Sequence, residues 1–279
     1  MSILSETLDL CKKYGIKPER SKGQNFLINE EIYNKIIEVA DLKKSDTILE
    51  VGPGLGFLTR KLASKVRKVI TVEIDNNLAS LLKKDIRTKK IDNIKVFNND
   101  ILKAKGSNFS KLGKYKIISN LPYNITSVFL RKFLSLNNKP ESIVLMLQKE
   151  VAERIVATVS DMTLLSCSVQ FYADAKIMFN VSKENFYPIP KVDSAVIKII
   201  PNKKLLSNFE EEKNFFKLLR VGFSSKRKML KNNLSNGLKL KSELIIKAFK
   251  SANLDEKVRS EQLLIEDWLK LYNFFKNNN

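Results

Sequence analysis

A glycine-rich stretch that follows an acidic residue is the first feature of this sequence that could bind a ligand. It reads Glu50-Val51-Gly52-Pro53-Gly54-Leu55-Gly56 and continues the apolar run TILEV. Glycines at such a strand-to-helix turn let the backbone pass close to a nucleotide-like ligand. The dinucleotide pattern G-x-G-x-x-G would need a glycine at position 57, where Phe57 stands. The spacing therefore favours S-adenosylmethionine over a nicotinamide dinucleotide, with Gly52 and Gly54 as cofactor-binding residues.

Two acidic residues follow the next two apolar runs. Glu73 ends KVITVE about 20 residues after the glycines, where a carboxylate can accept hydrogen bonds from both hydroxyls of a ribose. Asp100 ends IKVFNND, at the level expected for an adenine ring. Because the carboxyl ends of parallel strands meet at one edge of a sheet, we expect a single donor site. The alternative is a glycine-rich turn with two solvated acids.

The stretch SNLPYNI ends a fourth apolar run and so falls on the same edge. An exocyclic base amine is a weak nucleophile, and acceptors that hold its N–H groups favour the pyramidal nitrogen that attacks a methyl group. The side-chain oxygen of Asn120 and the carbonyl oxygen of Leu121 can act in this way. Pro122 stiffens the loop, and Tyr123 offers a face for a flipped base. Taken alone, this stretch would more often be a simple turn.

The composition excludes several other kinds of catalysis. The sequence has no histidine, and its two cysteines, Cys11 and Cys167, lie far apart. We therefore expect no metal, no disulfide and no Ser-His or Cys-His catalysis. Methyl transfer from a sulfonium needs no ionised base, since the sulfonium is a good leaving group and the amine proton can pass to water.

Hydrophobic periodicity predicts the elements that position these residues. From about residue 48, short apolar runs alternate with helical patterns, which indicates a doubly wound, Rossmann-like α/β domain with parallel strands. Extended stretches are expected at 164–181 and 194–201, and the pattern is wholly helical beyond Pro201. We expect a methyltransferase domain over 1–200, with an N-terminal substrate and cofactor flap at about 1–45, and an all-α domain over 201–279.

The charge of the chain indicates a polyanionic partner. Lysine and arginine total 50 against 30 acidic residues, a formal net charge of +20. The run Ser225-Lys226-Arg227-Lys228 is expected to open a helix, followed by Lys231, and to contact RNA phosphates. A solvated charged face is the alternative. A second basic cluster precedes residue 23 and comprises Lys12, Lys13, Lys17, Arg20 and Lys22.

Eight stretches together resemble the bacterial small-subunit ribosomal RNA adenine N6-dimethyltransferase family over nearly the whole chain. They are GQNFL at 23–27, EVGPGLGFLT at 50–59, VEID at 72–75, ND at 99–100, NLPYNI at 120–125, MLQKEVAERI at 146–155, NFYPIPKVDSAV at 185–196 and FSSKRKMLKNNL at 223–234. The resemblance implies an S-adenosylmethionine site lined by Asn25, Leu27, Gly52, Glu73, Asp100 and Asn120. It also implies that Phe186 closes on the target adenine opposite Tyr123. Lys22, Val128 and Met162-Thr163 depart from the family pattern and bear on substrate fit.

The resemblance implies a function as well. Family members dimethylate two adjacent adenines in a hairpin loop near the 3′ end of 16S rRNA, late in subunit assembly, so 16S rRNA in the immature 30S subunit is the expected partner. Two alternatives stay open: a 23S rRNA adenine N6-methyltransferase of the macrolide-resistance type, and an assembly factor whose methylation is incidental. The acidic N-terminus and the lack of a long apolar run predict a cytoplasmic protein without a membrane partner. We expect a monomer that needs no obligate protein partner.

Overall fold

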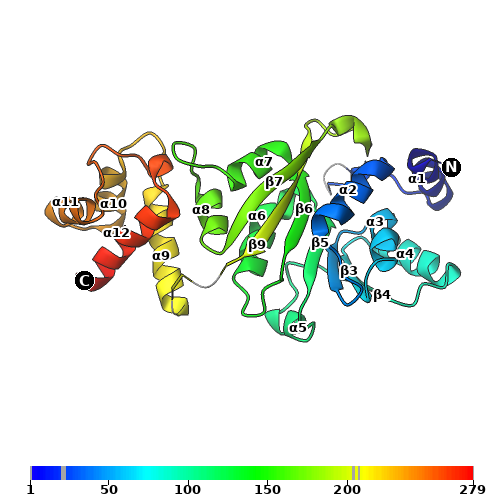
Figure 1. The fold of residues 1–279 in the computed structure, drawn as a ribbon. Helices are drawn as coiled ribbons and strands as arrows, with labels where there is room; N and C mark the ends of the chain where they lie inside the picture. Colours follow the sequence, from blue (N-terminus) through cyan, green and yellow to red (C-terminus); the bar gives the residue numbers. More distant parts are fainter. Residues whose placement is uncertain (1, 20–22, 203–204, 207, 279) are drawn as a thin grey trace. The chain divides into compact units, whose positions relative to one another are not determined.

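The computed structural model describes residues 2–19, 23–202, 205–206 and 208–278, which form two compact units (Figure 1). The larger unit comprises residues 1–152 and 175–201, and the smaller comprises 153–174 and 202–279. Residues 153–174 thus group with the C-terminal helices. The predicted division into a methyltransferase domain (1–200) and a helical domain (201–279) remains a prediction.

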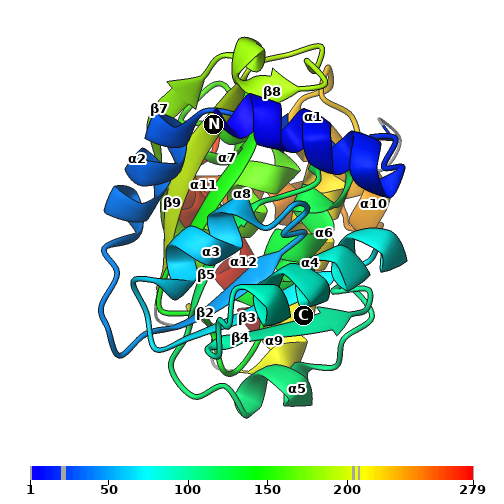
Figure 2. The same ribbon diagram turned by 90° about the vertical axis from the view of Figure 1, so that its right-hand side faces the viewer.

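A seven-stranded mixed sheet with the order β4-β3-β2-β5-β6-β9-β7 forms the centre of the larger unit (Figure 2). Its first five strands in the chain are parallel, and β9 runs antiparallel to β6. All residues of β2 and nearly all of β5 and β6 are buried, so helices cover both faces and the predicted doubly wound α/β fold is confirmed. The strands are β2 (Thr47–Val51), β3 (Lys68–Glu73), β4 (Ile94–Asn98), β5 (Lys116–Asn120), β6 (Ile143–Gln148), β7 (Ala173–Val181) and β9 (Ser194–Pro201).

Two of the helices that alternate with these strands, α2 (Glu30–Ala40) and α4 (Asn76–Thr88), begin at side-chain caps. The Asn29 side chain accepts from the Glu31 N–H, and the Asp75 side chain accepts from the N–H groups of Asn77 and Leu78. Within the described residues, no helix combines the length and the apolar character needed to span a bilayer. The helical segments are α1 (Ile3–Tyr14), α2 (Glu30–Ala40), α3 (Phe57–Ala63), α4 (Asn76–Thr88), α5 (Gly106–Ser110), η2 (Tyr123–Ile125), α6 (Thr126–Leu134), α7 (Lys149–Ile155) and η3 (Lys183–Asn185).

A second, two-stranded sheet joins segments that are far apart in the sequence. Strand β1 (Phe26–Leu27) pairs antiparallel with β8 (Phe186–Tyr187). The Tyr33 hydroxyl of α2 donates to the Leu27 carbonyl at 2.9 Å, which ties β1 to the core of the larger unit. The GQNFL stretch is therefore held beside the sheet by the NFYPIP stretch.

The prediction of one extended stretch over 164–181 is wrong in its first half. Residues Leu164–Gln170 form helix α8, and only Ala173–Val181 form a strand. A short apolar run such as LLSCSV is compatible with either structure. Here Thr163 and Ser166 form a reciprocal capping box, which favours the helix.

The smaller unit is helical, as the sequence predicts, but the basic run does not open a helix. Helix α10 begins only at Leu230, and Lys226 to Lys228 lie in the turn that precedes it. The Asn233 side chain donates to the carbonyls of Gly222 and Ser225 at 2.7 and 3.0 Å, which holds this segment as a turn. Besides α8, the helical segments are α9 (Phe209–Gly222), α10 (Leu230–Leu238), α11 (Ser242–Ser251), η4 (Ser260–Gln262) and α12 (Ile265–Asn277).

Candidate active site

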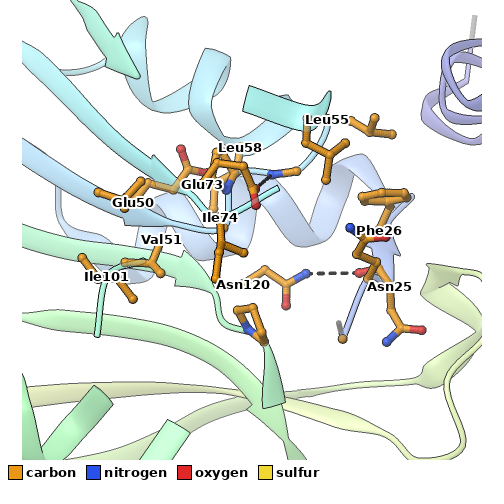
Figure 3. Close-up of a pocket in the computed structure, with 18 of the residues that line it drawn as sticks. Asn25, Phe26, Glu50, Val51, Leu55, Leu58, Glu73, Ile74, Ile101 and Asn120 are labelled. Atoms are coloured by element: carbon orange, nitrogen blue, oxygen red, sulfur yellow. Dashed lines mark hydrogen bonds between the residues drawn. The ribbon is translucent and has the colours of Figure 1, made fainter. Parts of the chain in front are cut away.

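A cavity of about 250 Å³ lies at the carboxyl ends of β2, β3, β4 and β5 (Figure 3). All seven residues that were predicted to bind the cofactor line it, although they come from five separate segments. Pro122 of the NLPY stretch lines it too. These residues are Asn25, Leu27, Gly52, Gly54, Glu73, Asp100 and Asn120.

The glycine loop shapes one wall of this cavity. Gly52 and Gly54 have φ angles of 65° and 56°, in the left-handed region that side chains disfavour. A Cβ atom on Gly52 would lie 3.4 Å from Cδ of Pro122, and one on Gly54 would lie 3.2 Å from the ring of Phe26. The missing side chains thus leave a cradle between the glycine loop, the NLPY stretch and β1.

Glu73 at the end of β3 is held by two backbone N–H groups. Its Oε2 accepts from Gly54 at 3.2 Å and its Oε1 accepts from Asp75 at 3.0 Å. The side chain is buried, and burial raises the pKa of Glu73, while the hydrogen bonds from Asp75 and Gly54 oppose the rise. The two hydrogen bonds fix the orientation of the carboxylate, and each oxygen retains a lone pair for a ligand hydroxyl.

Asp100 lies in a tight turn after β4. Its Oδ1 accepts from the Leu102 N–H at 2.8 Å. The Lys132 ammonium of α6 donates to the carbonyl of Leu102 at 2.7 Å and also to the carbonyl of Ala104. A cation from a neighbouring helix therefore holds the turn that carries Asp100.

Two asparagines that line the cavity, Asn25 and Asn120, are joined by a hydrogen bond. Nδ2 of Asn120 donates to the backbone carbonyl of Asn25 at 3.4 Å, as Figure 3 shows. The side-chain oxygen of Asn25 is buried, and no partner for it is found within the described residues. A buried acceptor without a donor is costly.

The structure does not place the remaining predicted catalytic residues, Leu121, Tyr123 and Phe186, on the wall of the cavity in the same way. Leu121 is buried and its N–H donates to the Met146 carbonyl at 3.1 Å. Tyr123 begins the short helix η2, but its side chain lies outside what the structure describes. Phe186 is only 1% exposed, belongs to the hydrophobic core and is not among the residues that line the cavity.

Among the lining residues to which sequence reasoning assigned no role, three have properties that bear on ligand binding. Ile74 and Ile101 directly follow Glu73 and Asp100, and Ile74 is 65% exposed although it is apolar. An apolar residue after each strand-end acid is a signal that could have identified both. The third is the Glu50 carboxyl, whose Oε2 accepts from the Thr59 hydroxyl at 2.6 Å.

The predicted RNA-binding residues of the smaller unit lie on its surface. Lys226, Arg227 and Lys228 are exposed, and Lys231 lies 3.0 Å from Oε2 of Glu256. Lys228 and Lys231 also line a polar cavity of about 460 Å³ together with asparagine and serine side chains of α10 and α11. Of the second basic cluster, Lys12, Lys13 and Lys17 are exposed, while Arg20 and Lys22 lie outside the described residues.

Comparisons with known proteins agree with this geometry. Residues 16–277 match the family described as ribosomal RNA adenine dimethylase. Ribosomal RNA small subunit methyltransferase A of Dehalococcoides mccartyi is 41% identical over 273 residues, which cover 97% of this chain and 92% of that protein. The protein of the same description from Bacillus pumilus is 38% identical over 277 residues, covering 96% and 94%.

Two solved structures are similar over most of the chain. A dimethyladenosine transferase from Plasmodium falciparum matches with a TM-score of 0.76 and 33% identity, covering 90% of this chain and 97% of that one. The 23S rRNA methyltransferase ErmE matches with a TM-score of 0.72 and 25% identity, covering 90% and 100%. The predicted methyltransferase fold and the predicted enzyme class, an rRNA adenine dimethyltransferase, are confirmed. This chain belongs to the ribosomal RNA adenine dimethylase family.

Proposed function

We propose that this enzyme uses S-adenosylmethionine to dimethylate N6 of two adjacent adenines in the hairpin loop near the 3′ end of 16S rRNA, within the immature small subunit. One observation carries the proposal: Gly52, Glu73, Asp100 and Asn120 converge on one cavity from the ends of four strands that are consecutive in the parallel part of the sheet. The names of its relatives from Dehalococcoides and Bacillus support the small subunit as the target.

The residues of the cavity fit the methyl donor. Glu73 would accept from the ribose hydroxyls and Asp100 from the adenine amine, while Ile74 and Ile101 offer apolar surface to the flat ring. When bound, the donor supplies an electrophilic methyl group on a sulfonium, and no metal is needed.

The NLPY stretch would hold the target amine. The hydrogen bond from Nδ2 of Asn120 to Asn25 sets the orientation of the amide, so that Oδ1 of Asn120 is the acceptor for an adenine N–H. The Leu121 carbonyl would accept the second N–H. Because both acceptors are neutral, the amine proton leaves to water after methyl transfer.

The target base needs a stacking surface, and Tyr123 is the first candidate for it. Phe186 is buried between β1 and the core, so its contact with a flipped adenine would require displacement of β8. Lys22, Lys226, Arg227, Lys228 and Lys231 would contact RNA phosphates. We propose that the enzyme acts as a monomer in the cytoplasm, where its ribosomal substrate is assembled.

The donor site is tested by calorimetric titration of Glu73→Ala with S-adenosylmethionine. Loss of hydrogen bonds to a charged, partly desolvated group should weaken binding by about 2 to 3 kcal/mol. Unchanged affinity in the folded variant would remove Glu73 from the donor site.

The target is tested by incubating the enzyme and labelled donor with immature 30S subunits or with naked 23S rRNA. The similarity to ErmE makes the 23S molecule the second candidate. Modification of two adjacent adenines in the 30S particle alone would support the proposal. Modification of 23S rRNA alone would overturn the assignment of the target without affecting the donor site.

A further inference from the structure

Glu50 is a buried carboxyl group that faces the donor cavity and has no role in the mechanism above. It is the fourth residue of β2 and is only 2% exposed, yet it lines the cavity together with Glu73 (Figure 3). The Thr59 hydroxyl at 2.6 Å is the hydrogen-bond donor to its Oε2. A buried carboxylate without a cation is strongly disfavoured, so this position calls for an explanation.

Within the described part of the chain, no cation forms a direct ion pair with Glu50. Glu73 faces it from β3 and adds negative charge, and the Tyr33 hydroxyl of α2 donates instead to the Leu27 carbonyl. Arg60 of α3 is the nearby cation, but its guanidinium pairs with Asp85 at 3.0 Å and with Glu6 at 3.4 Å. Glu50 therefore lines the cavity without a direct ion pair among the described residues.

Burial raises the pKa of Glu50 to about 8 and Glu73 adds to the rise, while the hydrogen bond from Thr59 and the charge of Arg60 oppose it. In the empty cavity at neutral pH the carboxyl group thus carries its proton most of the time. A positive charge placed in the cavity stabilises the ionised form and lowers this pKa.

We propose that Glu50 ionises when the cationic methyl donor enters the cavity, and that it makes the cavity prefer the donor over the demethylated product. The inference rests on the donor site proposed above. S-adenosylmethionine and S-adenosylhomocysteine differ by one methyl group and one positive charge at sulfur. A carboxylate that forms only in response to that charge favours the donor, and its reprotonation favours release of the product.

Linkage gives the sign of the pH dependence. A group whose pKa falls on binding releases a proton, so donor affinity increases as the pH rises towards the pKa of the empty site. Between pH 6 and pH 8 the wild type should gain about 25- to 50-fold in donor affinity beyond any gain seen in Glu50→Gln, if the pKa of Glu50 in the complex falls to about 6 or below. The product, which lacks the sulfonium charge, should show a smaller difference between the two proteins.

Isothermal titration of both ligands at pH 6, 7 and 8, in buffers of different ionisation enthalpy, measures affinity and proton release together. A control is needed because the donor's own α-amino group also titrates in this pH range. Glu50→Gln is the matched variant, since its amide oxygen can still accept a hydrogen bond from Thr59 but cannot ionise. A second variant, Thr59→Val, removes the hydrogen bond that opposes the rise in pKa. It should therefore move the pH dependence of donor affinity to higher pH.

The outcomes separate the two hypotheses. Greater proton release with donor than with product, abolished in Glu50→Gln, would support the inference. Equal proton release by wild type for donor and product would overturn it without the need for any variant, and so would identical pH profiles of wild type and Glu50→Gln. A donor that binds neither protein at any pH would overturn the donor site itself.

Discussion

At the scale of single residues, the proposed function assigns two roles to the NLPY stretch. Asn120 is held by its hydrogen bond to Asn25 beside the cavity, which suits an acceptor that acts while the target nitrogen becomes pyramidal. Stacking by Tyr123 would act earlier, when the base is captured. The two roles predict different kinetic defects.

We expect Asn120→Ala to lower the rate of methyl transfer by about 10²-fold or more, because a preorganised transition-state hydrogen bond is lost. Subunit affinity should hardly change. Tyr123→Phe should retain most activity and Tyr123→Ala little, since stacking contributes about 1 to 3 kcal/mol per base. Single-turnover methylation of saturating 30S subunits measures these rates. Wild-type transfer by Asn120→Ala, or inactive Tyr123→Phe, would refute the assignment.

Glu50 also has a consequence for stability. Its pKa of about 8 in the folded protein lies above the value of about 4.3 in an unfolded chain, so the folded state binds the proton more tightly. The stabilisation of the folded state by this proton is fully present below about pH 4.3 and is lost as the pH rises through about 8. In the absence of donor, Glu50→Gln should therefore be more stable than wild type at pH 8, and the difference should shrink towards pH 5. Thermal unfolding across this range checks the sign.

At the scale of elements, the donor cavity depends on contacts between segments that carry no chemistry themselves. The turn that bears Asp100 is held by Lys132 of α6 through the carbonyls of Leu102 and Ala104. We expect Lys132→Met to weaken donor binding by about 1 kcal/mol, the typical net value of a lost hydrogen bond. The exposed neighbour Arg131 supplies the control Arg131→Met. Calorimetric titration checks this prediction. The same donor affinity in both variants would show that Lys132 does not support the turn that carries Asp100.

The basic turn before α10 is the second element with a testable role. We expect reversal of Lys226, Arg227 and Lys228 to Glu to leave donor affinity intact and to make the salt dependence of subunit binding shallower, by a slope of about 2 to 3. The matched control reverses three exposed lysines of the larger unit, which changes the net charge equally: Lys43, Lys65 and Lys95. Filter binding over a salt series measures the slopes. Equal slopes for the two triple variants would mean that total charge, and not this turn, attracts the RNA.

At the scale of the whole molecule, the two compact units divide the chemistry. The larger unit contains the cavity and all the residues proposed for methyl transfer, and the smaller contains the basic turn. A net charge of +20 favours any polyanion, so charge alone does not select an adenine. We propose that the NLPY stretch and the surfaces around it select the reacting base.

The sequence by itself identified the residues that meet at one edge of the sheet and line the cavity. The glycine spacing, Glu73, Asp100 and Asn120 were identified because strand ends, glycine turns and capping residues are local signals with a known period. Parallel pairing then brings those strand ends to one edge, as the structure shows. The same local signals were ambiguous for the apolar run 164–170, where the capping box of Thr163 and Ser166 produces a helix.

Only the tertiary structure decided properties that depend on neighbours distant in the chain. The position of the basic run in a turn follows from Asn233, which bonds to carbonyls 11 and 8 residues earlier. The burial of Phe186 follows from its pairing with β1, about 160 residues away in the sequence. The raised pKa of Glu50 follows from burial under α2 and α3 and from the charge of Glu73. Burial and electrostatic environment are sums over many contacts in space, and no spacing along one strand encodes them.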